Sequence, residues 1–264
     1  MIKLAAIFPH SPLLHSGIGA DVHNSTKDTV KAIQVAVDEI YASQPDTIVI
    51  ISDQPTVYES HVTLHVQDPI RFDLSAFGDF SMREEVSTDI QLLDALQRDL
   101  RKKNIPITLD SVHALHFSAA IPLSYILKRH QHVQLLAIAP PTQADAKDIY
   151  EIGRAMQDVL IESSKRIVVV CAGDGSHALN QRSPNTPTSE GKKFDEYMQH
   201  ILVNKNASSL MSLNASIIEH AHQSMYTQTL LLFGVMHGIQ TTQKLHSYES
   251  PFGVGYFVAT YQPL

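Results

Sequence analysis

The sequence lacks tryptophan and contains a single cysteine, Cys171, among its 264 residues. One cysteine cannot form an internal disulfide, which favours a reducing compartment. No apolar run reaches the ~18 residues of a transmembrane helix, and the longest runs have the length of buried strands. The first apolar run starts at Ile2 with no charged segment ahead of it, so we expect no signal peptide. These absences predict a cytoplasmic protein.

Positive charge is also scarce, with 20 Lys and Arg against 27 Asp and Glu and a net charge of −7. The only basic cluster is Arg101, Lys102 and Lys103. Nucleic-acid-binding domains usually present a basic face, so we expect neither nucleic acid nor a membrane as partner. Hydrophobic residues make up 44% of the chain, which is enough for a buried core and excludes a disordered protein. Histidine, with 15 residues, outnumbers both Phe and Tyr.

Hydrophobic periodicity predicts strands alternating with helices. Ile2–Phe8 and Thr47–Ile51 read as buried strands, and between them Val30, Ile33 and Val37 follow the helix period. Further strands are expected at 57–66 (half-exposed), 105–109, 133–139, 166–171, 242–248 and 254–261. Further helices are expected at 86–100, 118–130 and 144–163, and helices dominate up to about residue 237. Loops are expected at 68–82 and 180–189. The alternation predicts one α/β domain over residues 1–264, with a mostly parallel or mixed central sheet and helices on both faces.

Polar residues follow several of these strands, where an open α/β sheet collects its ligands. His10 follows the first strand, Asp53 the second, and Asp174 and His177 the strand at 166–171. Two imidazoles and one carboxylate can hold a non-haem iron and leave positions open for substrate and oxygen. Turn chemistry explains the same residues individually, because Gly and Pro flank them. The segment 173–177 (GDGSH) lacks the final Gly that the nucleophile-elbow motif G-x-S-x-G requires, and this disfavours a Ser176–His177 dyad.

Four segments, in the same order along the whole chain, resemble one known family. They are 5–13 (AAIFPHSPL), 45–52 (PDTIVIIS), 173–177 (GDGSH) and 247–256 (SYESPFGVGY). The chain resembles the class III extradiol ring-cleavage dioxygenases, the superfamily of the protocatechuate 4,5-dioxygenase catalytic subunit, which is related to the Memo proteins.

The resemblance implies a cytoplasmic oxidoreductase that uses Fe(II) and dioxygen to open a catechol-type ring in aromatic compound metabolism. His10 matches the first metal-binding His, and Glu249 matches the carboxylate ligand. His177 matches a His that moves protons at the substrate and oxygen. The family also implies a homodimer, or a partnership with a paralogous subunit.

Two positions depart from the family pattern. Gln54 stands where the family has its second metal-binding His, and a neutral amide oxygen is a poor iron ligand. Where the family has a second acid–base His, alignment on Ile121 places Phe117, although a one-residue bulge would bring His116 into that role.

Two hypotheses follow from this pattern. In the first, the protein is a working Fe(II) dioxygenase whose metal site uses Gln54 or Asp53, aided by His15 or His61. In the second, the fold and pocket remain but iron chemistry is lost, and the protein binds a small molecule or serves as a non-catalytic partner subunit. Both expect four side chains to converge at one end of the sheet: His10, Gln54, His177 and Glu249.

Overall fold

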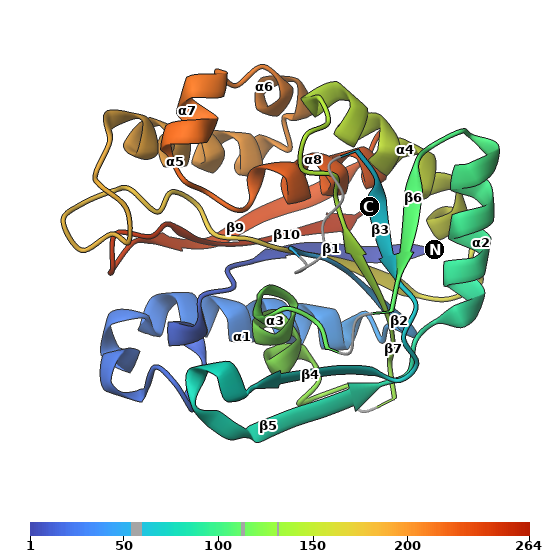
Figure 1. Ribbon diagram of the computed structural model, residues 1–264, viewed down its shortest axis with the longest axis horizontal. Helices are drawn as coiled ribbons and strands as arrows, with labels where there is room; N and C mark the ends of the chain where they lie inside the picture. Colours follow the sequence, from blue (N-terminus) through green and yellow to red (C-terminus); the bar gives the residue numbers. More distant parts are fainter. Residues whose placement is uncertain (54–59, 112–113, 131) are drawn as a thin grey trace.

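The central feature of the fold is an eight-stranded mixed sheet, seen in a computed structural model that describes all residues except 54–59, 112–113 and 131 (Figure 1). In spatial order its strands are β6 (Ile107–Asp110), β3 (Val62–His65), β7 (Gln134–Ala139), β2 (Thr47–Ile51), β8 (Ile167–Ala172), β1 (Ile2–Phe8), β10 (Tyr256–Pro263) and β9 (Thr241–Glu249). The four central strands β7, β2, β8 and β1 are parallel. Strand β10 pairs antiparallel with β1, and β3 pairs antiparallel with β7. The predicted single α/β unit with a mixed sheet is confirmed.

Helices cover both faces of the sheet. Helices α1 and α3 lie on one face, together with the separate hairpin of β4 and β5, and α4 to α8 lie on the other (Figure 1). The helices are α1 (Lys27–Ala42), α2 (Ile90–Lys102), α3 (Phe117–Ile126), α4 (Ala146–Glu162), α5 (Ser189–Asn204), α6 (Ala207–Met211), α7 (Ala215–His220) and α8 (Tyr226–Val235). Short 3-10 turns occur at Pro12–Leu14, Ala20–Ser25 and Ser75–Phe77. Among the described residues, no helix is long and apolar enough to cross a membrane.

Because both faces are covered, the central strands are hydrophobic throughout rather than alternating. Every residue of β2 and β8 is buried. Successive side chains still point to opposite faces, so Val169 joins the core under α4 and α8, whereas Val168 and Val170 join the core under α1 and α3. The sheet therefore separates two hydrophobic cores.

Two sequence predictions about secondary structure are wrong. The strand predicted at 57–66 is β3, which is buried rather than half-exposed: Val62 and Leu64 join the core under α4 and α8, and Thr63 and His65 are also buried. Residues 57–59 lie outside the described part. The loop predicted at 68–82 contains a β-hairpin of β4 (Ile70–Leu74) and β5 (Asp79–Val86). In β4, buried Ile70, Phe72 and Leu74 alternate with exposed residues, a signal that the nearby Pro and Gly obscured.

Helices α4 and α8 approach closely through two glycines. A Cβ built on Gly153 would lie 2.2 Å from the carbonyl oxygen of Leu231 and 2.9 Å from the Cα of Gly234. A Cβ on Gly234 would lie 2.1 Å from the carbonyl oxygen of Tyr150. Backbone atoms cannot move aside as side-chain ends can, so this contact requires glycine on both helices.

We expect Gly153→Ala to lower the free energy of unfolding by ~1–3 kcal/mol, the usual cost of overpacking a core. The exposed Lys147→Ala on the same helix is the control and should change it by less than about 0.5 kcal/mol. Urea unfolding followed by circular dichroism measures both. Equal stability of the two variants would show that the helices can separate without cost.

Candidate functional site

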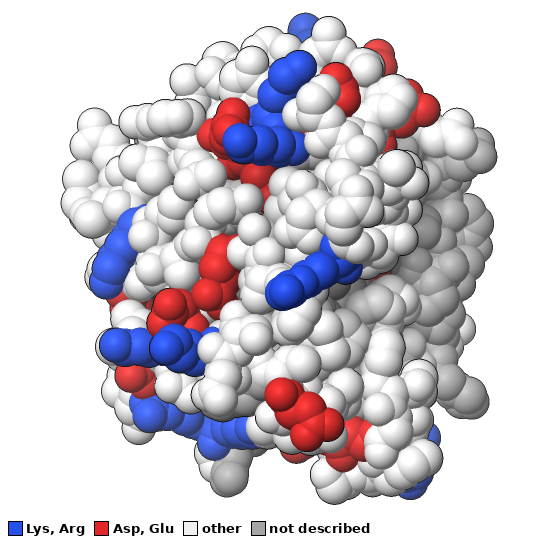
Figure 2. Space-filling model, turned by 90° about the vertical axis from the view of Figure 1, so that its left-hand side faces the viewer, with Lys and Arg blue, Asp and Glu red and all other residues white. Residues whose placement is uncertain are grey.

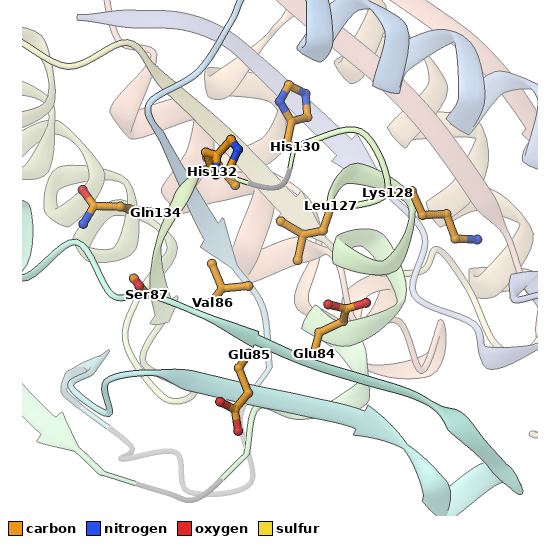
Figure 3. Close-up of a pocket in the computed structure, with 10 residues that line it drawn as sticks. Glu84, Glu85, Val86, Ser87, Leu127, Lys128, His130, His132 and Gln134 are labelled. Carbon is orange, nitrogen blue, oxygen red and sulfur yellow. The ribbon is translucent and has the colours of Figure 1, made fainter.

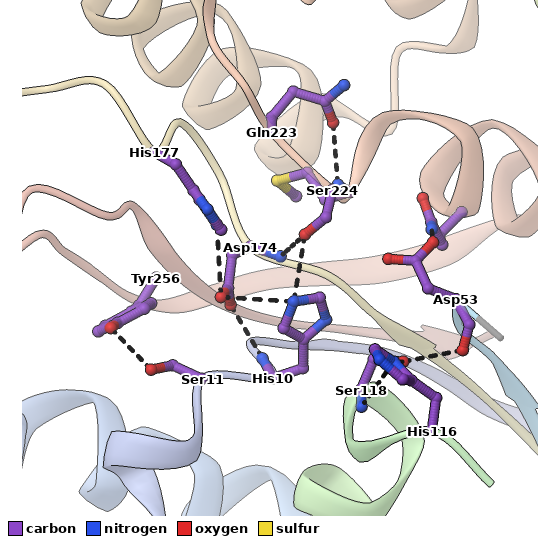
Figure 4. Close-up of polar contacts among 12 residues, drawn as sticks. His10, Ser11, Asp53, His116, Ser118, Asp174, His177, Gln223, Ser224 and Tyr256 are labelled. Atoms are coloured by element: carbon purple, nitrogen blue, oxygen red, sulfur yellow. Dashed lines mark hydrogen bonds and ion pairs between the residues drawn. The ribbon is translucent and has the colours of Figure 1, made fainter. Parts of the chain in front are cut away.

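The sheet topology brings three polar loops together. Strand β8 lies between β2 and β1, and all three run parallel, so their carboxyl ends meet at one edge. Asp53 follows β2, Asp174 follows β8 and His10 follows β1. The antiparallel β10 starts at the same edge, where the Tyr256 hydroxyl donates a hydrogen bond to Ser11 Oγ at 3.0 Å. This edge is the candidate site (Figure 4).

The centre of the site is the carboxylate of Asp174, which is 2% exposed. Its Oδ2 lies 3.6 Å from Nε2 of His10 and 3.6 Å from Nε2 of His177 (Figure 4). Its Oδ1 accepts a hydrogen bond from the His10 backbone N–H at 2.9 Å. Burial alone would raise the pKa of Asp174, but the charges of His10 and His177 and the hydrogen bonds outweigh it and lower the pKa. Asp174 is thus an ionised group held between two imidazoles.

Ser224 joins this group from the loop before α8. Its hydroxyl lies 3.3 Å from His10 Nε2, and it accepts a hydrogen bond from the Asp174 backbone N–H at 3.0 Å. Both Ser224 and Asp174 approach the same nitrogen of His10, whereas a nucleophilic triad needs its serine and its carboxylate on opposite ring nitrogens. A hydrolase triad is therefore not the chemistry of this site. No sequence motif surrounds Ser224, so only the fold reveals its role.

Asp53 is a second buried carboxyl on the other side of His10. Burial raises the pKa of Asp53, the charge of His10 opposes the rise, and Asp174 adds to it. Its Oδ1 accepts a hydrogen bond from the Gln228 amide, and its backbone carbonyl accepts one from Ser118 Oγ at 2.9 Å. These contacts attach the ends of α3 and α8 to the end of β2.

Phe117, rather than His116, faces His10. The ring centroids of Phe117 and His10 are 5.7 Å apart in an edge-to-face arrangement, and Phe77 packs edge-on against Phe117 at 5.1 Å. The imidazole of His116 lies beside Phe117, with Nδ1 3.0 Å from Ser118 Oγ, where it caps α3. Burial, followed by the charge of His10, lowers the pKa of His116. An aromatic row thus runs from the surface at Phe77 to the buried His10.

Glu249, which the resemblance makes a metal ligand, contacts Thr29 at the start of α1. Its Oε1 accepts hydrogen bonds from the backbone N–H of Thr29 at 3.0 Å and from the Thr29 hydroxyl at 2.6 Å. Thr29 lies in the first turn of α1, where backbone N–H groups have no partner within the helix and favour a carboxylate. The geometry therefore gives Glu249 a helix-capping role, and it stands directly across from Tyr256 in the β9–β10 pair.

The other predicted ligands are placed as follows. Gln54 lies outside the described residues. His15 pairs with Asp79 at 3.4 Å, against the β4–β5 hairpin, and His61 Nδ1 lies 2.9 Å from Thr108 Oγ1 near β6. Of the four side chains expected to converge, the structure brings together His10 and His177, joined by Asp174.

The donors can be compared with the iron ligands that the resemblance implies. Two buried ring nitrogens, Nδ1 of His10 and Nε2 of His177, have no hydrogen-bond partner in the described part of the chain, but Nε2 of His177 already faces the Asp174 carboxylate at 3.6 Å. Over the same residues, no three side chains of His, Cys, Asp or Glu are arranged to hold a metal ion. Glu249 is engaged with Thr29. The described residues therefore do not fit the family's iron-binding set.

A large hollow lies elsewhere on the molecule. It has a volume of about 750 Å³ and is lined by Val86, Leu127, His130 and Gln134, among others (Figure 3). Gln134 begins β7, so this hollow is at the amino end of the parallel strands, opposite the candidate site. The face of the molecule in Figure 2 shows Lys and Arg interspersed with Asp and Glu, with no single-sign field. The hollow is therefore separate from the candidate site.

The chain is similar to one known protein family over nearly its whole length. A family model described as the catalytic LigB subunit of aromatic ring-opening dioxygenase matches residues 4–259. The chain belongs to the LigB family. This confirms the family expected from the four sequence segments, and the match runs across all of the strands that form the candidate site.

Two further proteins are similar to this chain, and neither name states an activity. Protein CA_C1420 of Clostridium acetobutylicum is 22% identical over 261 residues, which cover 96% of this chain and 56% of that protein. The chain thus spans a little over half the length of this curated relative. The crystal structure of uncharacterized protein JW3007 from Escherichia coli K12 superposes with a TM-score of 0.61 at 15% identity, covering 98% of this chain and 99% of that one.

We expect Asp174→Asn to lower the free energy of unfolding at neutral pH by ~1–3 kcal/mol, because the imidazoles lose their buried counter-charge. Because folding lowers the pKa of Asp174, its carboxylate stabilises the folded protein at pH values above the ordinary pKa of 3.8, and this contribution is lost as the pH falls. The difference between wild type and variant should therefore shrink in acid. Urea unfolding across pH measures it, with the exposed Asp148→Asn as control. A difference that stays constant with pH would contradict the assignment.

The capping role of Glu249 gives a separate prediction. Glu249→Ala and Thr29→Ala should each lower the free energy of unfolding by ~0.5–2 kcal/mol, as loss of a helix cap does. Because they remove one shared interaction, the double variant should lose less than the sum. Glu249→Gln keeps an acceptor oxygen and should lose least. Strictly additive losses would mean that Glu249 and Thr29 act independently.

Proposed function

We propose that this protein is an extradiol-dioxygenase-like protein that binds a small phenolic compound at the cluster of His10, Asp174 and His177. The observation that carries the proposal is the buried carboxylate between two imidazoles, one of which, His10, keeps its Nδ1 without a partner among the described residues. Buried polar atoms without a hydrogen-bond partner are rare in proteins, and each calls for an explanation such as a catalytic role or a bound water or ion.

The cluster has the chemistry to take a proton from a phenolic hydroxyl. Imidazole ordinarily titrates near 6.5, which suits it to accept that proton near neutral pH. The proton passes from the phenolic oxygen to Nδ1 of His177, the ring nitrogen that does not face Asp174, on a side chain that is partly exposed and thus reachable. A phenolate and an imidazolium result, and the ionised Asp174 stabilises the imidazolium without taking the proton itself.

The aromatic row favours a planar ligand. Phe117 and Phe77 present ring edges and faces beside His10, and aromatic pairs stack or meet edge-on at such distances. A phenol, unlike a sugar or an aliphatic acid, combines a planar ring for this row with a hydroxyl for the imidazoles. This matches the aromatic ring-opening chemistry for which the family is named.

Iron-dependent ring opening is the second candidate function. It is favoured by the family description and by the unpartnered Nδ1 of His10, which is a donor of the type that iron accepts. It is opposed by Gln54 in place of an imidazole and by the contact of Glu249 with Thr29. A homodimer or a complex with a paralogous subunit stays a prediction, which light scattering tests.

The test uses 4-nitrocatechol, whose visible spectrum reports ionisation of its hydroxyls. We expect wild-type protein purified without oxygen to bind it in the ionised form. His177→Ala should weaken binding by roughly 10–100-fold, the cost of losing a charge-assisted hydrogen bond. Glu249→Ala, the control, should bind as wild type does.

Iron is tested on the same preparations by metal analysis, Fe(II) reconstitution and oxygen uptake with catechol, gallate and aminophenol. Stoichiometric iron and oxygen uptake would favour the second candidate. Absence of 4-nitrocatechol binding with and without Fe(II) would overturn both functions.

A further inference from the structure

Asp195 is a buried carboxyl behind the site that no part of the proposed chemistry uses. It lies on α5 and is 1% exposed. Within the described residues no Lys or Arg forms an ion pair with it, although buried carboxylates are usually paired with a positive charge. Burying such a carboxyl group costs free energy, so the groups that contact Asp195 indicate its role.

Both carboxylate oxygens of Asp195 bind segments that shape the candidate site. Oδ1 accepts a hydrogen bond from the backbone N–H of Ser176 at 2.7 Å, and Oδ2 accepts one from the Tyr248 hydroxyl at 2.8 Å. Ser176 stands between Asp174 and His177 in the chain, and Tyr248 lies on β9. The carboxylate therefore joins the loop that carries the cluster to the outermost strands of the sheet.

Two glycines make room for this carboxylate. A Cβ on Gly175 would lie 2.7 Å from Asp195 Oδ1, and a Cβ on Gly255 would lie 2.0 Å from Oδ2. The same glycines link the two segments directly, because the N–H of Gly175 donates to the carbonyl of Gly255 at 2.7 Å and the N–H of Gly255 donates to the carbonyl of Ser176 at 2.9 Å. The sequence motifs GDGSH and FGVG thus meet around one side chain.

The electrostatics agree with this arrangement. Burial raises the pKa of Asp195 to about 7, while the hydrogen bonds from Ser176 and Tyr248 and the charge of His177 oppose the rise. Burial, followed by the charge of Asp195, also raises the pKa of Tyr248, so the tyrosine remains a donor.

We propose that Asp195 is the positioning residue of the site: by holding the Ser176 amide, it fixes the distance and orientation of Asp174 and His177 toward the ligand. The consequence for ligand binding rests on the proposed function, but the anchoring of the loop does not. Asp195 itself touches neither the ligand nor the imidazoles.

The experiment compares three variants. Asp195→Ala removes both acceptors, Asp195→Asn keeps an oxygen for the Ser176 N–H, and Tyr248→Phe removes only the other partner. Hydrogen exchange of the Ser176 amide, followed by NMR, reads the anchor without any ligand. We expect fast exchange in Asp195→Ala alone, and slow exchange in the other two variants and in wild type.

Binding of 4-nitrocatechol measures how loss of the Asp195 contact with Ser176 changes the affinity of the site for a ligand. Asp195→Ala should bind roughly tenfold or more weakly, because the buried Ser176 N–H is left without its acceptor, and Asp195→Asn should restore most of the affinity. Equal losses in Ala and Asn, or slow Ser176 exchange in Asp195→Ala, would overturn the proposal. If wild type binds no phenol but the exchange pattern holds, the proposed function fails and the anchor stands.

Should Asp195→Ala not fold, wild-type exchange alone decides. Asp195 is the acceptor that the structure gives the Ser176 N–H, so this amide should exchange as slowly as the amides of the buried strand β8. Exchange at the rate of an open loop would contradict the anchor.

Discussion

The ionised carboxylate of Asp174 is the group around which the site is organised. A buried negative charge needs partners, and the partners available at the end of β8 are the His10 amide, the two imidazoles and the loop before α8. Their positions depend on the parallel order β2, β8, β1, which places three strand ends side by side. The topology of the sheet therefore determines which partners surround the buried charge of Asp174.

Much of the fold could be predicted from the sequence because buried strands and amphipathic helices leave strong periodic signals. Thr47–Ile51 has no polar residue beyond its first position, and α1 buries Val30, Ile33 and Val37 at helical spacing. The β4–β5 hairpin escaped prediction because its alternation covers only five residues in β4 and is interrupted at Gly78. Short antiparallel pairs depend on cross-strand contacts that one segment does not reveal.

The site was predicted in part, and the reason lies in what a motif records. His10 and His177 were found because they follow strands and match family segments, and the structure does bring them together. Glu249 also matches a segment, yet its carboxylate contacts Thr29, a partner 220 residues away in the chain that no local pattern indicates. Ser224 and Asp195 were missed for the same reason, since each acts through contacts made only in the folded chain.

The hairpin of β4 and β5 pairs separately from the main sheet, buries one face of β4 in the core under α1 and α3, and brings Phe77 at its turn against Phe117. The aromatic row therefore depends on the turn of the hairpin, whereas His10, Asp174 and His177 follow strands of the main sheet. A change in length at the exposed turn of residues 75–78 would move Phe77 relative to Phe117 and leave the strand order of the main sheet as it is. The position of this ring and the positions of the three cluster side chains are thus determined by different parts of the fold.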